Sequence, residues 1–400
     1  MTVTAPAHRA GARGADVHGA GPHAADFLGA GLESVLQETV AAQADLVDRD
    51  GRFPAESIAA LRRRGVLGLM SPREFGGGGA GLAEACHVIE RLAAVCGSTA
   101  MVLLMHYAAT TVIEAYGPED VRRSVADGSH LSTLAFSETG TRSHFWVPAG
   151  TAAPEGDAVR LDAEKSWVTS ADRADSYVWS SRPLSSPGPM TMWLVPRASA
   201  GLHVQGDYDG FGLRGNASSP VTATGVSVPA SAMLGPDGGG LDAALEKVLP
   251  CFLVLSAAFS LGVMEALTTI AREHLMSTRL AHLDRSLSEQ PLPRQTYARL
   301  RMRTDGVRTF LDDTLTAVAS GRENAMLRVL QAKAVAAEAA GEVADGVMRL
   351  CGGSAFRREL GVERRFRDAL AARVMAPTTE ALYDFAGRAE LGLPLFEEAR

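Results

Sequence analysis

The sequence predicts an α+β protein with an N-terminal α-helical domain, a middle antiparallel β-domain and a C-terminal helical bundle. Three observations support this order. Apolar residues recur at helical spacing in the first part of the chain, short β-type runs follow, and long helical patterns then return. We expect a disordered leader and three domains, with boundaries at 1–27, 28–128, 129–237 and 238–400.

The N-terminal domain is predicted from two helical runs. In RFPAESIAALRRRGVLGLM, Pro54 suits the start of a helix, and Ile58 and Leu61 share one face of it. The second run, AEACHVIERLAAVCGSTAMVLLMHYAATTVI, keeps apolar residues at the same spacing. Between them, REFGGGGAG predicts a loop, because four consecutive glycines cannot hold a regular element.

The middle domain is predicted from four short runs, AVRLDAEKSWVT, SYVWSSR, MTMWLVP and VTATGVSVP. They are rich in Val, Trp and Thr and are separated by Gly, Pro, Asp and Ser, which is typical of strands joined by turns. In the last domain, QAKAVAAEAAGEVADGVMRLCGG predicts a helix that Gly352 and Gly353 end. Its apolar stripe consists of Val335, Ala339, Val343, Val347 and Leu350.

One run is apolar enough to raise the question of a membrane span. LPCFLVLSAAFSLGVMEAL could cross a bilayer by length. However, it carries Pro250 near its start and includes Ser256, Ser260 and Glu265. We therefore predict a buried helix of the bundle and no membrane partner.

Composition narrows the class of protein. A chain of 400 residues with 46% hydrophobic and 21% charged residues fits a soluble globular protein. The net charge of -7 argues against a phosphate-binding surface, and so against a nucleic-acid partner. The leader lacks the apolar core of a signal peptide. The four cysteines show neither CxxC pairing nor metal-like spacing with His, which predicts free thiols, a cytoplasmic protein and no metal site.

Three motifs follow one another along the chain. They are LAFSETGTRSHFW at 134–146, EKSWVTSADRADSY at 164–177, and GFGLRGNASSP with a later LGPDGGG near the end of the β-domain. Read with the order of the domains, they resemble the acyl-CoA dehydrogenase family over about residues 30–395. The resemblance implies a four-helix bundle at the C-terminus, FAD as cofactor and an acyl thioester as substrate. We expect the third motif to support the fold without chemistry of its own.

The segment EKSWVTS implies one wall of the flavin site. An isoalloxazine ring is a large planar surface that an indole can cover, and a nearby hydroxyl can hydrogen-bond the N5 edge that receives hydride. The resemblance therefore assigns Trp167 and Thr169 to the flavin wall and backbone contacts to Val168. The alternative is a tryptophan that only belongs to the core of the β-domain.

The segment LAFSETGTRSHFW implies contacts with both flavin and substrate. Leu134, Phe136 and Ser137 match positions that meet the flavin ring. Ser143 matches a serine beside the pantetheine arm of the thioester, and we assign it to substrate binding together with Arg142. The alternative is a loop that only faces water. Three residues depart from the family pattern and would bring a cation and an imidazole to the pocket mouth: Thr139, Arg142 and His144.

The resemblance places the flavin's diphosphate and adenosine against a neighbouring subunit. Two negative charges need arginine or well-aimed backbone N–H groups, which Arg279 and the pair Gly352–Gly353 would supply. His282 and Arg349 depart from the family pattern there. The glycine pair also fits a plain helix end. The implied active unit is a homodimer or homotetramer.

The segment RVMAPTTE lacks the base that this chemistry normally uses. A positioned carboxylate that removes the weakly acidic α-proton contributes roughly 10²- to 10⁴-fold in rate. The family supplies it from one of two positions, which are Ala376 and Phe252 here, and neither side chain accepts a proton. Pro377 biases Ala376 towards an extended backbone, and Thr378 keeps the hydroxyl that contacts the cofactor.

The sequence offers few other titratable residues that could accept the α-proton. Glu246 and Glu380 fall outside the expected substrate face. His87 and His106 lie in helical runs, where we expect buried histidines with satisfied hydrogen bonds. His144 is the one candidate for proton transfer that the motifs support.

Three functions stay open at this stage. The first is FAD-dependent α,β-oxidation of an acyl thioester, carried by CoA or a carrier protein, with a relocated or absent base and a separate electron acceptor. The second is a flavin-dependent monooxygenase on the same fold, which needs no such base but would need another organic substrate, oxygen and a flavin reductase. The third is a catalytically degenerate flavin-binding subunit.

Overall fold

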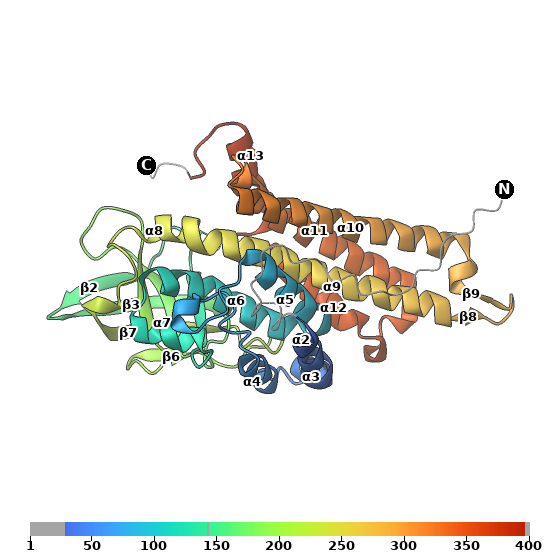
Figure 1. Cartoon of the computed structure of the whole chain (residues 1–400), viewed down its shortest axis with the longest axis horizontal. Helices are drawn as coiled ribbons and strands as arrows, with labels where there is room; N and C mark the ends of the chain where they lie inside the picture. The colour runs from blue at the N-terminus through green and yellow to red at the C-terminus, as the bar shows by residue number, and fades with distance from the viewer. Residues whose placement is uncertain (1–28, 142–143, 397–400) are drawn as a thin grey trace.

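The structure is a computed structural model that describes residues 29–141 and 144–396. Helices, then strands, then longer helices follow one another along the chain, as predicted (Figure 1). The predicted leader lies outside the described residues. The N-terminal elements are α2 (Ala30–Val35), a π-helical turn (Leu36–Val40), α3 (Ala41–Arg49), α4 (Ala55–Arg63), a 3₁₀ turn (Arg73–Phe75), α5 (Leu82–Val95), α6 (Gly97–Tyr116) and α7 (Glu119–Ala126).

Local sequence explains where these helices begin. Pro54 stands directly before α4, and Ile58 and Leu61 are buried on one face of that helix, as predicted. At the start of α5, the backbone N–H of Gly81 donates to the Glu84 carboxylate at 2.9 Å. The negative charge in this first turn also suits the helix dipole.

The middle domain contains two sheets. A three-stranded sheet has the order β1-β4-β5, and a four-stranded sheet has the order β2-β3-β7-β6. The strands are β1 (Ser132–Ala135), β2 (Thr151–Glu155), β3 (Ala158–Val168), β4 (Ser176–Ser181), β5 (Thr191–Pro196), β6 (Leu202–Val204) and β7 (Ser219–Pro229), with a 3₁₀ turn at Ala230–Ala232.

One pairing corrects the prediction of a fully antiparallel domain. Strands β1 and β4 are parallel, whereas the other neighbours in the two sheets are antiparallel. A parallel pair needs a long crossover connection. The chain provides one here, because β2 and β3 of the other sheet lie between β1 and β4 in the sequence.

The C-terminal domain is a bundle of three long helices and two shorter ones. α9, α10, α11 and α12 pack together, and α11 also contacts α13. The elements are α8 (Gly240–Ala243), a π-helical turn (Ala244–Val248), α9 (Leu249–Ser277), β8 (Arg279–Leu280), β9 (Arg285–Ser286), α10 (Pro291–Ser320), α11 (Ala325–Cys351), α12 (Val362–Val374) and α13 (Thr379–Glu390), with 3₁₀ turns at Leu287–Glu289, Gly352–Ser354 and Arg358–Leu360.

The apolar run of the sequence forms α9. Gly240–Ser277 is apolar and long enough to cross a membrane, but 89% of its most apolar window is buried inside the protein. The prediction of a buried bundle helix is therefore confirmed. The predicted stripe of α11 is also confirmed at its centre, where Ala339, Val343 and Val347 are fully buried. The four cysteines are free and buried.

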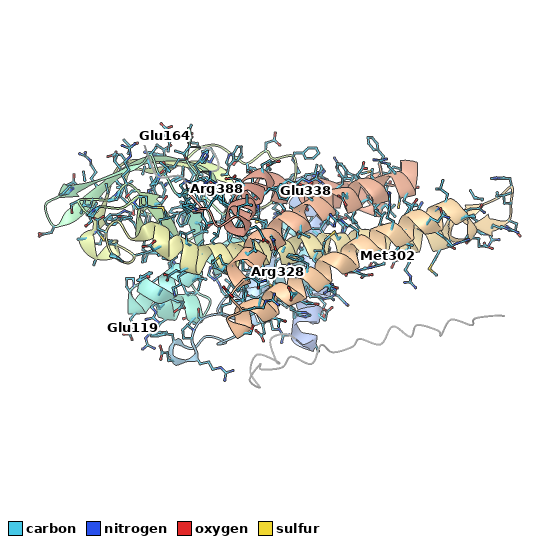
Figure 2. All side chains as sticks on the ribbon, turned by 90° about the horizontal axis from the view of Figure 1, so that it is seen from above. Glu119, Glu164, Met302, Arg328, Glu338 and Arg388 are labelled. Atoms are coloured by element: carbon cyan, nitrogen blue, oxygen red, sulfur yellow. The ribbon has the colours of Figure 1, made fainter. Side chains whose placement is uncertain are left out.

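The molecule is elongated in both overall views. The strands gather at one end, while α9 and α10 extend to the β8–β9 hairpin at the other (Figures 1 and 2). Met302, which is exposed, projects from the outer side of α10 (Figure 2).

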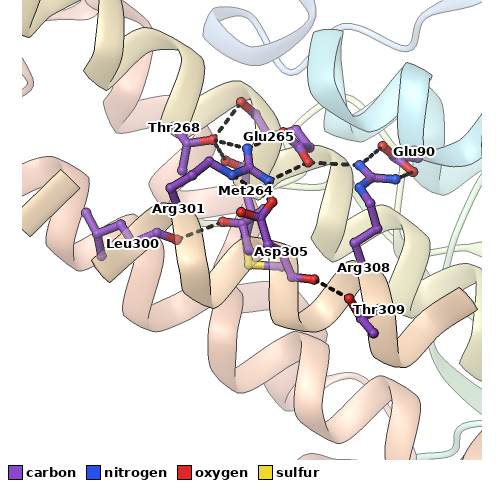
Figure 3. A network of polar contacts seen from close by, with 10 residues as sticks. Glu90, Met264, Glu265, Thr268, Leu300, Arg301, Asp305, Arg308 and Thr309 are labelled. Carbon is purple, nitrogen blue, oxygen red and sulfur yellow. Dashed lines mark hydrogen bonds and ion pairs between the residues drawn. The ribbon is translucent and has the colours of Figure 1, made fainter. Parts of the chain in front are cut away.

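A charged network joins the N-terminal domain to the bundle (Figure 3). The Glu265 carboxylate on α9 accepts hydrogen bonds from Arg301 at 2.6 and 2.8 Å and from Arg308 at 2.8 Å. Arg308 on α10 also donates to Glu90 of α5 at 2.6 Å. Burial raises the pKa of Glu265, but the two arginines outweigh burial and hold that pKa below its usual range. Glu265 is thus the shared acceptor of the network.

The substitution Glu265→Gln tests how much this network contributes to the free energy of unfolding. We expect the free energy of unfolding to fall by about 1–3 kcal/mol, because two half-buried guanidinium groups lose their common counter-charge. Glu342→Gln is the control, since Glu342 pairs with Arg303 on the exposed surface, where such a pair contributes about 0–1 kcal/mol. Urea unfolding of both variants measures the difference, and equal losses would contradict the central role of Glu265.

His106 is a buried histidine with both ring nitrogens satisfied, as predicted. Nδ1 accepts from the backbone N–H of Ser132 at 3.1 Å, so Nε2 carries the proton and donates to the Leu67 carbonyl oxygen at 3.2 Å. Burial lowers its pKa to about 4. His87, in contrast, is exposed, because it shares the outer face of α5 with Glu84 and Arg91. The expectation of a buried histidine was wrong there.

The low pKa of His106 predicts acid lability. Its folded-state pKa lies below the unfolded value of about 6.5, so the unfolded chain binds more protons between the two. The stabilisation is present above pH 6.5 and is lost as pH falls to about 4, by up to about 3 kcal/mol. We expect His106→Gln to remove this part of the pH dependence. Unfolding free energies at pH 4.5 and 7.5 measure it, and parallel pH curves for both proteins would refute the assignment.

Candidate active site

A cavity of about 1090 Å³ lies where the β-domain meets α6, α9 and the segment after α12. Two kinds of wall enclose it. The β-domain side carries hydroxyl, amide and aromatic groups besides Leu134, and the side formed by α6, α9 and the segment after α12 is apolar except for Thr378. The lining residues used below are Met101, Met105, Leu134, Phe136, Ser137, Glu138, Trp167, Thr169, Tyr208, Asn216, Ser218, Val248, Leu249, Phe252, Met375, Ala376, Pro377 and Thr378.

Trp167 presents its indole at the polar wall. A register shift between Lys165 and Val168 interrupts the pairing of β3 with β7, and Trp167 there has a φ of 54°. This left-handed backbone is unusual for a residue with a side chain and turns the indole out of the sheet. Trp167 is 69% exposed, whereas Val168 is buried in the core of the β-domain. The side chain of Val168 therefore does not line the cavity.

Hydroxyl groups lie beside this indole. Thr169 Oγ1 and Ser218 Oγ are 3.0 Å apart and share one hydrogen bond, so one of the two hydroxyl protons stays available to another acceptor. Thr378 Oγ1 accepts from the backbone N–H of Ala381 at the start of α13, which leaves its own proton available. The cavity thus offers hydroxyl donors from two different elements.

Glu138 lines the cavity but is fully engaged by other groups. The ammonium of Lys165 donates to Glu138 Oε1 at 2.5 Å and to the carbonyl and hydroxyl oxygens of Ser180 at 2.7 and 2.9 Å. The backbone N–H groups of Ala149 and Gly150 donate to Glu138 Oε2. Burial lowers the pKa of Lys165 to about 8, and the Glu138 charge opposes this. Because removing either partner would leave a buried charge, we regard this pair as an anchor for the segment around Ser137.

The opposite wall carries both positions at which the base was expected. Ala376 and Phe252 line the cavity, and neither can accept a proton. Among the described lining residues, Glu138 and Tyr208 are the ionisable ones. Burial raises the pKa of Tyr208, whose hydroxyl donates to the Gly212 carbonyl oxygen at 3.1 Å. The described part of the lining therefore contains no free carboxylate.

The remaining predictions for this segment fall outside the cavity lining. His144 is exposed, hydrogen-bonds the Thr141 carbonyl oxygen through Nδ1 at 3.0 Å, and packs its ring edge-on against Trp146. The structure therefore does not bring its imidazole into the cavity. Arg142 and Ser143, the predicted substrate-binding residues, lie outside the described residues.

The predicted adenosine residues lie at another part of the molecule. Arg279 follows α9, and Gly352 and Gly353 follow α11, which runs in the same direction as α9 because α10 turns back between them. These helix ends lie near the β8–β9 hairpin, away from the strands of the middle domain (Figure 1). Arg279 is exposed and pairs with Asp284 at 2.5 Å. Within one chain, these three residues do not join the cavity.

Sequence reasoning missed several lining residues. Asn216 and Ser218 belong to GLRGNASSP, which we expected only to support the fold, and the structure places both in the cavity lining. The motif itself was the available signal. Met101 and Met105 on α6 and Tyr208 in a loop carried no comparable signal, because only the tertiary fold brings them to the site.

Known proteins match the whole of this architecture. Family models described as the acyl-CoA dehydrogenase N-terminal, middle and C-terminal domains match residues 27–127, 133–226 and 238–391. Cyclohex-1-ene-1-carbonyl-CoA dehydrogenase of Geobacter metallireducens is 26% identical over 373 residues, which cover 90% of this chain and 96% of that protein.

Two solved structures have the same fold. Butyryl-CoA dehydrogenase from Megasphaera elsdenii has a TM-score of 0.86 at 21% identity and covers 93% of this chain and 98% of its own. The prolyl acyl carrier protein oxidase AnaB has a TM-score of 0.84 at 18% identity and covers 93% of this chain and 100% of its own. The predicted class of fold, helices then β-domain then helical bundle, is confirmed.

The exposed indole of Trp167 gives a direct test of the flavin wall. We expect Trp167→Ala to weaken FAD binding by about 2- to 10-fold, because stacking of aromatic surfaces contributes about 0.5–1.5 kcal/mol. Leu292 is the control, since it is 73% exposed at the start of α10 and lines neither this cavity nor the adjoining groove. Titration of apoprotein with FAD measures both affinities, and an equal change for Leu292→Ala would argue against the wall.

Proposed function

Since the chain belongs to the acyl-CoA dehydrogenase family, whose members are FAD-dependent oxidoreductases, we propose that it oxidises the α,β-bond of an acyl thioester with an apolar acyl group. The observation that carries the proposal is the contrast between the two cavity walls. Aromatic and hydroxyl groups suited to a flavin face an apolar wall that contains no free carboxylate among its described residues.

The residues present fit a flavin. Trp167 offers an exposed planar surface. Thr378 keeps its hydroxyl proton, and the Thr169–Ser218 pair keeps one of its two. When bound, FAD supplies the acceptor for the hydride that leaves the β-carbon. The protein's part is to orient the acyl group against that acceptor and to exclude water.

The apolar wall defines the acyl group that fits. Leu249 and Phe252 line it from the start of α9, Val248 from the π-helical turn before α9, and Met101 and Met105 from α6. An amino or carboxylate group on the acyl chain would lose its hydration there without gaining a partner. We therefore infer a linear, branched or cyclic hydrocarbon acyl group.

A backbone donor lies on the same side of the cavity. The Met375 carbonyl oxygen accepts from Lys333, and a planar trans peptide directs the Ala376 N–H the opposite way. No described group accepts a hydrogen bond from this N–H. It is free to donate to the thioester carbonyl oxygen, which would acidify the α-proton and reduce the need for a strong base.

The remaining parts of the proposal concern partners. The electrons would pass to a separate acceptor protein, and the free thiols fit a cytoplasmic location. Arg279, Gly352 and Gly353 lie far from the cavity of their own chain, which supports their predicted role towards the flavin of a second subunit in a homodimer or homotetramer. CoA and a carrier protein both remain as carriers of the thioester.

A flavin-dependent monooxygenase is the second candidate. The apolar, carboxylate-free wall favours it, because oxygenation of an organic substrate removes no α-proton and benefits from a dry site. It would receive its electrons from a reductase and would consume oxygen.

Anaerobic titration separates these functions. We would add straight, branched and cyclic acyl-CoA thioesters, and the same acyl groups on a carrier protein, to the FAD-loaded chain and follow bleaching of the flavin band. Bleaching with formation of the enoyl product supports the dehydrogenase. Failure to bleach, together with reductase-dependent oxygen uptake and an oxygenated product, supports the monooxygenase. A chain that takes up no FAD would contradict both enzyme functions.

Restoring a carboxylate at Ala376 gives a sharper prediction. We expect Ala376→Glu to speed bleaching by a hydrocarbon acyl-CoA by between about 10-fold and 10⁴-fold, because the new base would face the substrate from the cavity wall. Ala376→Gln has a similar volume without a base and is the matched control. Stopped-flow reduction rates compare the three proteins. An unchanged rate in Ala376→Glu, with FAD still bound, would contradict the dehydrogenase proposal.

A further inference from the structure

Lys333 is a buried cation that the proposed reaction does not yet use. It lies on α11, is 1% exposed, and among the described residues it hydrogen-bonds backbone oxygens and no carboxylate. Its ammonium donates three hydrogen bonds, to the carbonyl oxygens of Ala372 at 2.8 Å, Met375 at 2.9 Å and Pro377 at 2.8 Å. All three acceptors belong to the end of α12 and the turn that follows it.

This geometry uses the full donor capacity of a lysine. An ammonium has three N–H groups, and each of them points to one carbonyl oxygen. The Ala372 carbonyl lies in the last turn of α12, where the helix dipole favours a cation. Burial lowers the pKa of Lys333 to about 7, and the charge of Glu380 opposes this. Three converging carbonyl dipoles also oppose loss of the proton.

The two expected base positions both adjoin this ammonium. Ala376 lies between two of the residues whose carbonyl groups Lys333 binds. The ring centroid of Phe252 is 6.0 Å from Nζ. Lys333 itself is not among the residues that line the cavity. It therefore acts behind the apolar wall and not on the substrate directly.

We propose that Lys333 is a positioning residue that fixes the turn at residues 375–377, which carries Ala376 in the cavity wall opposite the flavin. By binding the carbonyl groups on both sides of Ala376, it sets the direction of that residue's side chain and N–H. Other backbone hydrogen bonds hold the two ends of the turn, where the Met375 N–H donates to the Ala371 carbonyl oxygen and the Thr378 carbonyl oxygen accepts from Leu382, both at 3.0 Å. Between these ends, Ala376 has no polar side chain that could anchor it. The expected effect of Lys333 on the reaction rate rests on the proposed function. The expected effect of Lys333 on the order of the turn does not depend on the reaction.

A proton-transfer role for Lys333 fits the geometry less well. A base needs a lone pair directed at the substrate, whereas the three N–H groups of this ammonium are directed at backbone oxygens. If Lys333 only stabilised the whole fold, its substitution would lower the free energy of unfolding without affecting one segment more than the others. The positioning role makes a different prediction, because it ties Lys333 to one short segment.

Hydrogen exchange tests the structural part without any turnover. Lys333→Met keeps an unbranched side chain of similar length and removes all three donors. We expect the peptide spanning residues 371–383 to exchange at least 10-fold faster, with and without FAD, while peptides from β3 and α10 are unchanged. Lys333→Gln keeps two N–H donors, so we expect this peptide to exchange at a rate between those of the unsubstituted protein and Lys333→Met. Glu265→Gln is the control for a general loss of stability and should leave this peptide protected.

A double-mutant cycle tests the functional part. If Lys333 directs residue 376, the rate gain from Ala376→Glu should shrink by at least 10-fold in the Lys333→Met background and persist in the Glu265→Gln background. An undiminished gain, or exchange that rises equally in all peptides, would overturn the positioning role. If Ala376→Glu gives no gain in any background, the proposed reaction fails, and the exchange of residues 371–383 alone decides the role of Lys333.

Discussion

The rest of the structure depends on the burial of α9. This helix is apolar around most of its circumference, so it must be covered on several sides at once. α5 and α6 of the N-terminal domain cover it from one direction, and α10, α11 and α12 of the bundle cover it from others. Burying one helix thus joins the first and last domains into a single core. The start of α9, including Phe252, is what remains facing the cavity.

Three charged side chains inside this assembly are each stabilised by several polar partners. Lys165 has a carboxylate and the two oxygens of Ser180, Glu265 has two arginines, and Lys333 has three carbonyl groups. An uncompensated buried charge would cost several kcal/mol. Each of these sets of contacts also links elements that are distant in sequence. Lys165 fixes the segment beside the flavin wall, and Lys333 fixes the turn on the other side of the cavity. The width of the cavity therefore depends on both lysines.

Much of the fold was readable from the sequence because its signals are local. Helical periodicity placed α5, α6 and α11, and Trp- and Val-rich runs placed β3, β4, β5 and β7. The parallel pairing of β1 with β4 was missed, because strand direction depends on the path of the chain through the other sheet. The same limit applies at the site. Trp167, Thr169 and Ala376 stood in recognisable motifs, whereas Met101, Tyr208 and Lys333 reach the cavity or its wall only through long-range packing.

The missing carboxylate places two demands on the site that oppose each other. Without a protein base, the α-proton must leave to water or to a group on the substrate, yet an apolar wall that includes Phe252 and Ala376 keeps water away. Glu138 cannot resolve the conflict, since Lys165 and two backbone N–H groups hold its carboxylate, and Tyr208 is a weaker acid than usual. A substrate whose α-proton is already acidified removes the conflict, and so does a reaction that takes no α-proton. In either case, the protein contributes dryness and orientation, and the rigidity of the turn around Ala376 then matters more than any single ionisable group.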